Sequence, residues 1–205
     1  MSLMEAGQFE HMPVRQIRQV ARALGAELVT TVRWRGGDLD RLLDEGHAAL
    51  AGVVTKWLER RGWAVRPEVT FSVFGERGSI DLMAWHEATR TLIVVELKTE
   101  LTSLEETLRR HDAKARLAPA IATQRLGWRP DGLARLLVLP NAPTARRRVS
   151  RHEPVLARAY PLRAADVRDW VRSPRGAPRG LVLVSVGRQG RVLSRRRVRP
   201  AAGLR

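Results

Sequence analysis

The apolar and polar residues along the chain repeat first with a helical period and then with a strand period. The first segment has helical spacing at Val14, Ile17, Val20, Ala21 and Leu24. Gly25 can end this helix, because glycine readily adopts the left-handed conformation that follows a helix. Glu27–Trp34 is rich in valine and threonine and predicts a strand, which Gly36 and Gly37 end.

A second, longer helix is predicted to begin near Asp38 or Asp40 and to reach about Arg61. Either aspartate can cap its start, and Gly62 can stop it. Its apolar residues form a broad stripe, at Leu42, Leu43, Leu50, Val53, Val54, Trp57 and Leu58. A stripe of this width indicates a helix that packs on a sheet.

Three strands are predicted next, over Trp63–Phe74, Ser79–Trp85 and Thr91–Lys98. The connections between them are short, which favours an antiparallel meander. Ser103, followed three residues later by Glu106, matches a capping box and predicts a helix that reaches about Arg125. The pattern therefore reads helix, three strands, helix.

The remainder of the chain adds two apolar strands and two helical segments. Leu136–Leu139 and Leu181–Val186 predict the strands, and Thr144–Tyr160, interrupted by Pro154, and Ala164–Val171 predict the helices. We interpret residues 39–187 as one α/β domain, preceded by a helix and strand over residues 1–38. Residues 188–205 are rich in arginine, contain no acid and predict a disordered basic tail.

Composition narrows the classes of function. The chain has no cysteine, which excludes disulfides, zinc–thiolate sites and thiol nucleophiles. It has no apolar run near the roughly 18 residues that span a membrane, and no signal-peptide pattern, so we expect a cytoplasmic protein with no membrane partner. Its 37 basic and 21 acidic residues give a net charge of +16. That excess favours a nucleic-acid partner, although a GC-rich genome would also raise the arginine content.

Charged residues at the predicted strand pair are the strongest indication of chemistry. Glu96 and Lys98 close an apolar run and share one face of the strand, and Asp81 lies on the preceding strand. Two neighbouring carboxylates repel each other unless a cation lies between them. Oxygen ligands suit Mg²⁺ or Mn²⁺, and a nearby lysine can orient a water. The alternative is a Glu96–Lys98 pair at a strand end, with Asp81 solvated in a turn.

A strand bearing Ile80-Asp81, then a strand ending Glu96-Leu97-Lys98, both between two helices, resembles the core of the PD-(D/E)XK nuclease superfamily. The same segments also resemble Holliday-junction-resolvase-like and very-short-patch-repair-like members. The resemblance covers roughly Leu39–Arg125 and implies a restriction-endonuclease-like core, a mixed β-sheet flanked by helices in the order α-β-β-β-α-β. It also implies Mg²⁺ or Mn²⁺ held by Asp81, Glu96 and the backbone carbonyl of Leu97, with Lys98 as the catalytic lysine.

The sequence departs from this family pattern at two places. Ile80 stands where a proline is usual. Many members carry a glutamate on the first helix, for which Glu45 and Glu59 are candidates out of the expected register, and Glu68 on the first strand is a substitute. Lys114 matches a helix position that often carries lysine or glutamine, although a helix lysine is more often solvated.

The N-terminal segment Val14–Leu28 resembles the last helix of a lambda-repressor-type helix-turn-helix domain. In actinobacterial proteins such a domain precedes a nuclease-like one. Too few residues precede this helix for a complete domain, so the resemblance implies a truncated remnant. A short amphipathic helix that covers one face of the sheet is the alternative.

The sequence thus predicts a metal-dependent DNA endonuclease, a hydrolase of phosphodiester bonds, and leaves open whether its DNA substrate is branched or damaged. A nuclease-fold protein that binds DNA or regulates transcription without turnover is the alternative, and an RNA-directed role is a third. Arginines and one lysine are the expected phosphate contacts: Arg77, Lys114, Arg146, Arg147 and Arg148. The sequence leaves a homodimer open.

Overall fold

The computed structural model describes residues 13–28, 37–73 and 75–187, with the backbone alone for residues 37–44. The chain divides into two compact units, residues 1–40 and residues 41–205. Most of the strand predicted over Glu27–Trp34 and the whole predicted tail, residues 188–205, lie outside the described residues.

The first unit contains α1, Val14–Ala23, which confirms the first predicted helix. Gly25 has a φ of 70°, so glycine provides the left-handed residue that the helix end requires. The backbone N–H of Gly25 donates to Arg22 O at 3.1 Å, and that of Ala26 donates to Ala21 O at 2.8 Å. These two bonds satisfy carbonyls that the end of a helix otherwise leaves unpaired.

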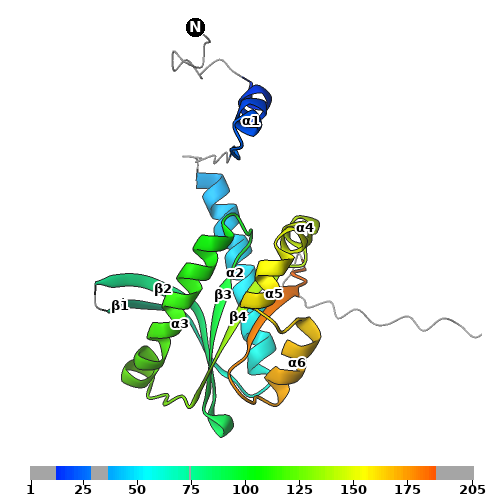
Figure 1. Ribbon diagram of the computed structural model, residues 1–205. Helices are drawn as coiled ribbons and strands as arrows, with labels where there is room; N and C mark the ends of the chain where they lie inside the picture. Colours follow the sequence, from blue (N-terminus) through cyan, green and yellow to red (C-terminus); the bar gives the residue numbers. More distant parts are fainter. Residues whose placement is uncertain (1–12, 29–36, 74, 188–205) are drawn as a thin grey trace, which may run out of the picture. The chain divides into compact units, whose positions relative to one another are not determined.

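The second unit is a mixed α/β structure, as the sequence predicts (Figure 1). Its elements are α2 (Gly37–Glu59), of which the residues from Arg41 on belong to this unit, β1 (Ala64–Val73), β2 (Glu76–His86), the short 3₁₀ turn η1 (Glu87–Thr89), β3 (Thr91–Leu97), α3 (Leu104–Leu126), β4 (Gly132–Pro140), α4 (Pro143–Arg151), α5 (Glu153–Ala159), α6 (Ala164–Arg172) and β5 (Arg179–Val184). Helix α2 begins at Gly37, so Asp38 and Asp40 fall inside its first turn and not at its cap.

The five strands form one sheet in the order β1-β2-β3-β4-β5. The first three strands pair antiparallel, which confirms the predicted meander. Strands β3, β4 and β5 pair parallel, and the connections between them run through α3 and through α4 to α6. Parallel neighbours need such long crossovers, because the chain must return to the same end of the sheet.

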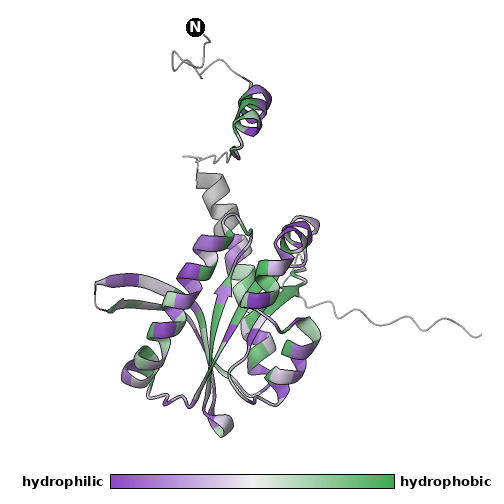
Figure 2. Cartoon of the chain, viewed as in Figure 1, coloured by the Kyte–Doolittle hydropathy of each residue, from purple (hydrophilic) through white to green (hydrophobic). Residues whose placement is uncertain are grey.

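Helices cover both faces of the sheet, so the core has three layers. Helices α2 and α6 pack on one face, where Leu50, Val54 and Val171 join the buried strand residues. Helix α3 covers the other face over β2 and β3, and α5 packs beside it over β4 and β5. Figure 2 shows the hydrophobic central strands in green between helices whose outer faces are largely purple.

Several local features follow from single residues. Ser103 Oγ accepts the backbone N–H of Glu106, which is one half of the predicted capping box, while the Glu106 carboxylate pairs with Arg109 and Arg110. Helix α3 continues through Pro119. Pro154 lies in the first turn of α5, so the predicted interrupted helix is two helices. Within the described residues, no helix is long and apolar enough to cross a bilayer.

Candidate functional site

Asp81 lies at a break in the regular pleat of β2. Ile80 packs with Met83 and Trp85 in the α3-side cluster, whereas Leu82 packs on the α2 side. Two strand residues that are two positions apart normally share a face, so the alternation of side chains reverses across Asp81. A strand that reverses in this way can direct a polar side chain out of the sheet at the point of the reversal, which here lies beside the end of the β2–β3 pairing.

The sheet register places three acids in one row across three strands. Strand β1 pairs with β2 at Pro67↔Leu82 and Val69↔Ile80, so Glu68 falls opposite Asp81. The β2–β3 register ends at Leu82↔Val95, and its continuation places Asp81 opposite Glu96. The predicted proximity of Asp81 and Glu96 follows from this register.

Glu68 has a φ of 49°, which is unusual for a residue other than glycine. For a residue that has a side chain, this backbone conformation costs on the order of 1 kcal/mol and persists only where the surrounding structure imposes it. The strained residue is the neighbour of Asp81 in the row, so the irregular backbone of β1 and the reversed pleat of β2 coincide at the same point of the sheet.

Asp81 is fixed to the next strand through its side chain. The backbone N–H of Leu97 donates to Asp81 Oδ2 at 2.7 Å, while the backbone N–H of Lys98 donates to Val138 O at 3.0 Å on the other side. A charged acceptor makes the first of these bonds stronger than an ordinary amide bond. The end of β3 is therefore held between β4 and the carboxylate of Asp81.

Glu96 is the buried acid of the site, with 1% of its surface exposed. Lys114, on α3, donates from Nζ to Glu96 Oε2 at 2.6 Å and to Asp81 Oδ1 at 2.8 Å. One ammonium therefore bridges the two carboxylates from the helix above them. A buried carboxylate is tolerated only when it is paired in this way.

Lys98 approaches Glu96 from the other side. Its Nζ lies 3.0 Å from Glu96 Oε1 as an ion pair. Lys98 also lowers the pKa of Glu96, so its ammonium is a second cationic partner of this carboxylate. Glu96 is therefore held between two ammonium groups, Lys114 at Oε2 and Lys98 at Oε1.

The ionisation of the cluster follows from burial and the four charges. Burial alone would raise the pKa of Glu96, but Lys114 and then Lys98 outweigh it and lower the pKa from its ordinary value. Burial alone would lower the pKa of Lys114, but Asp81 and Glu96 outweigh it and raise that pKa. Glu96 is therefore a carboxylate and Lys114 an ammonium at neutral pH.

A cavity of about 390 Å³ opens beside Asp81. It is lined by His47, Ala48, Ala51, Pro67, Glu68 and Asp81. Glu68, the substitute acid proposed from the sequence, therefore shares a cavity with Asp81. Glu45 lies exposed on the same helix as His47 but is not among the residues that line this cavity.

The predicted phosphate-binding arginines occupy different environments. Arg77 is exposed on β2. Arg146 and Arg147 are exposed on α4, where Arg146 donates to Asn141 Oδ1 at 2.8 Å. Arg148 is half-buried and donates to the backbone carbonyl of Leu101. Arg146 and Arg147 thus remain open to a ligand, whereas Arg148 tethers α4 to the loop before α3.

A buried histidine lies between α3 and β3 next to the site, and the sequence pattern did not predict a role for it. His111, one turn before Lys114 on α3, is 1% exposed. Its Nε2 lies 3.2 Å from Val94 O, and its Nδ1 lies 2.7 Å from the Tyr160 hydroxyl. A carbonyl can only accept, so Nε2 carries the proton and Nδ1 accepts from the tyrosine. Burial lowers the pKa of His111 to about 4, which keeps the ring neutral.

A compositional signal marks two members of this site. Among 37 basic residues, lysine occurs only at Lys56, Lys98 and Lys114, and the last two both contact Glu96. A compact ammonium suits a crowded carboxylate pair better than the planar guanidinium, which is made for bidentate recognition. In a chain that otherwise uses arginine, the rare lysines point to the site.

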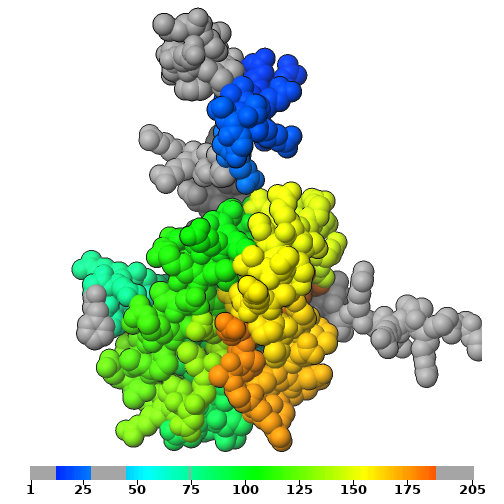
Figure 3. Space-filling view, in the orientation of Figure 1, coloured from blue at the N-terminus to red at the C-terminus, as the bar shows by residue number. Residues whose placement is uncertain are grey.

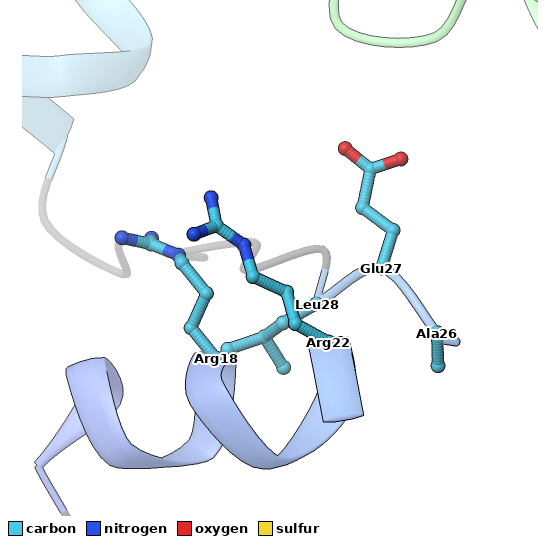
Figure 4. A pocket seen from close by; sticks show the side chains of 5 residues that line it. All are labelled: Arg18, Arg22, Ala26, Glu27 and Leu28. Atoms are coloured by element: carbon cyan, nitrogen blue, oxygen red, sulfur yellow. The ribbon is translucent and has the colours of Figure 1, made fainter. Parts of the chain in front are cut away.

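The first unit contains a separate, smaller cavity of about 290 Å³, lined by Arg18, Arg22, Ala26, Glu27 and Leu28. Figure 4 shows the side chains of Arg18, Arg22 and Glu27 projecting to the same side of the segment. Arg18 and Arg22 are one helical turn apart on α1, and both are exposed. Nothing beyond these charges indicates a ligand there.

No protein-family model and no curated protein matches the chain. Among solved structures, the chain matches the crystal structure of AF1548, a protein of unknown function, with a TM-score of 0.33 and 14% sequence identity. The similarity covers 51% of this chain and 53% of that one, so this chain spans about half the length of its neighbour. A TM-score this low carries no argument about function.

Proposed function

We propose that the protein is a divalent-metal-dependent DNA endonuclease of the PD-(D/E)XK type. The observation that carries the proposal is the convergence of Asp81 and Glu96 on one cation, Lys114 Nζ, at 2.8 and 2.6 Å. The order of elements from Gly37 to Pro140 also supports the proposal. It is helix, three strands, helix and strand, the order that the resemblance implies. The net charge of +16 supports a polyanionic substrate.

The donor set of the site fits Mg²⁺ or Mn²⁺. Both acids offer carboxylate oxygens, which these ions prefer, and one oxygen of each already lies against a single cation, Lys114 Nζ. Asp81 and Glu96 would hold the ion, with the backbone carbonyl of Leu97 as the further ligand that the resemblance implies. When bound, the ion would polarise a phosphoryl oxygen and acidify a water.

The protein's own side chains would supply the rest of the chemistry. Lys98, 29% exposed and within 3.0 Å of Glu96, would orient the attacking water and stabilise charge that develops on the phosphate. The Leu97–Asp81 bond would fix one carboxylate relative to the other. Arg146 and Arg147, both exposed, would contact the backbone of the nucleic acid.

The test is a cleavage panel with the full-length protein. Linear, branched and mismatched DNA would be incubated with Mg²⁺ and with Mn²⁺, beside the Asp81→Ala and Lys98→Ala variants. We expect metal-dependent cleavage by the wild type that each substitution abolishes, with DNA binding largely retained. Cleavage that survives both substitutions would show that the activity does not come from this site.

A second function is favoured by one observation. Lys114 already neutralises the carboxylate pair. This pairing suits a nuclease-fold protein that binds DNA or regulates transcription without cleaving it. Its DNA binding should weaken with salt and be unchanged by a chelator, and metal-dependent cleavage in the same panel would reject it.

A further inference from the structure

The two candidate metal ligands, Asp81 and Glu96, are matched by two ammonium groups before any metal is considered. Asp81 and Glu96 contribute two negative charges, and Lys98 and Lys114 contribute two positive charges within 3.0 Å of them. Glu96 is 1% exposed, and the side chains of Asp81 and Lys114 are each 13% exposed. A divalent cation added to this cluster would leave two uncompensated positive charges in a poorly solvated place, which is costly.

Of the two lysines, Lys114 occupies the position between the carboxylates that a shared metal ion would take. Its Nζ contacts one oxygen of each carboxylate, 2.8 Å from Asp81 and 2.6 Å from Glu96. Within the described part of the chain, the Lys98 ammonium pairs with Glu96 alone, at its other oxygen. The position on which both acids converge is therefore held by the Lys114 ammonium, and a metal shared by the same two acids needs that position.

Lys114 also explains how the site is stable without a metal. Two neighbouring carboxylates of which one is buried repel each other, and this repulsion opposes folding unless a cation lies between them. The lysine comes from α3, whose buried residues His111, Ala115 and Ala118 anchor the helix against the sheet. Its four-carbon side chain can turn away from the pair without movement of the helix.

We infer that Lys114 is an internal counterion that competes with the divalent metal for Asp81 and Glu96. This inference rests on the proposed function, because it takes the two acids as the metal ligands. It assigns Lys114 a role distinct from phosphate contact: the lysine keeps the metal-free site folded and weakens metal binding until its ammonium leaves the carboxylates.

The experiment compares the wild type with Lys114→Met, which keeps an unbranched side chain, one heavy atom shorter, and removes its charge. Lys56→Met is the matched control, because Lys56 is exposed on α2 and its replacement removes the same charge. Mn²⁺ affinity is measured by titration calorimetry, and thermal unfolding is followed with and without Mn²⁺. Lys114→Gln is the second variant, to be used if Lys114→Met does not fold.

We expect Lys114→Met to bind Mn²⁺ about tenfold more tightly than the wild type, the change that corresponds to about 1.4 kcal/mol of lost competition. Without metal it should unfold several degrees below the wild type, and Mn²⁺ should restore more of its stability than it adds to the wild type. Lys56→Met should match the wild type in both measurements.

Two results would overturn the inference, and they differ in what they say about the proposed function. Equal or weaker Mn²⁺ binding by Lys114→Met, beside clear binding by the wild type, would remove the competition and leave the metal site intact. Binding by neither protein would reject the inference together with the metal-dependent function. Binding by the variant alone would support the inference in its strongest form.

Discussion

The carboxylate of Asp81 accepts the backbone N–H of Leu97 at 2.7 Å, so a side chain takes the place of a strand carbonyl where β2 and β3 separate. The two strands pair regularly as far as Leu82↔Val95. One oxygen of Asp81 holds the end of β3, and the other contacts Lys114. Asp81 is thus part of the fold as well as of the candidate site.

Asp81→Ala should cost stability, because it leaves the Leu97 N–H without its acceptor and Lys114 with one carboxylate. An unsatisfied buried donor costs about 1–3 kcal/mol. Asp81→Asn keeps an acceptor oxygen for Leu97 and should cost less than Asp81→Ala. Urea unfolding of both variants checks this, and equal midpoints would mean that the Leu97 bond contributes nothing to stability.

Lys98→Met should remove cleavage without unfolding the protein. The side chain of Lys98 is 29% exposed and its ammonium pairs with Glu96, so its loss removes one partly solvated ion pair while Lys114 still compensates Glu96. A general acid–base group typically contributes about 10²–10⁴-fold to a rate, and we expect a loss of that order. Cleavage kinetics measure it, and Lys56→Met is again the control for a lost lysine charge.

The sequence alone was sufficient to bring Asp81 and Glu96 together. Short connections predict a meander, a meander makes the two strands neighbours, and period-two alternation places Glu96 and Lys98 on one face. The structure agrees at each step because these rules depend on local geometry. The predicted interruption at Pro154 agrees for the same reason, since proline constrains its own segment.

The sequence could not predict the bridging role of Lys114. A lysine on an amphipathic helix is usually solvated, and only the packing of α3 over β2 and β3 shows that this one reaches two carboxylates. The sequence also could not predict the reversal of the pleat at Asp81 or the left-handed conformation of Glu68. Both arise where three strands meet. Non-local packing overrides local preference at these positions.

Folding stability should fall as pH decreases from about 6.5 to about 4, because of His111. Its pKa is lowered from 6.5 to about 4 by burial, so between these values the unfolded chain binds the extra proton and the folded chain does not. Stability then rises with pH in this window and is fully present above it. A shift of this size corresponds to at most about 3 kcal/mol.

Urea unfolding at pH 7.5 and at pH 5 measures this effect, with His111→Gln as the comparison. Glutamine can still contact Val94 or Tyr160 but does not titrate, so the variant should lose less stability than the wild type between the two pH values. His152 is half-buried between α4 and α5. His152→Gln is the control, because it removes a histidine and leaves the buried ring of His111 in place. An equal loss in all three proteins would assign the pH dependence to other groups.

The last prediction concerns the exposed arginines of α4. This helix shares an apolar cluster with α3 and α5, and Figure 3 shows these green and yellow segments on one face of the molecule. Replacing both Arg146 and Arg147 by alanine should weaken DNA binding and reduce the slope of log affinity against log salt by about 2, since each phosphate contact contributes about 0.9. Fluorescence anisotropy across a salt series measures the slope. Arg168→Ala with Arg175→Ala, two exposed arginines in and after α6 on the other side of the sheet, is the control. The same slope change in both pairs would show that the whole basic surface binds DNA and that α4 has no special part.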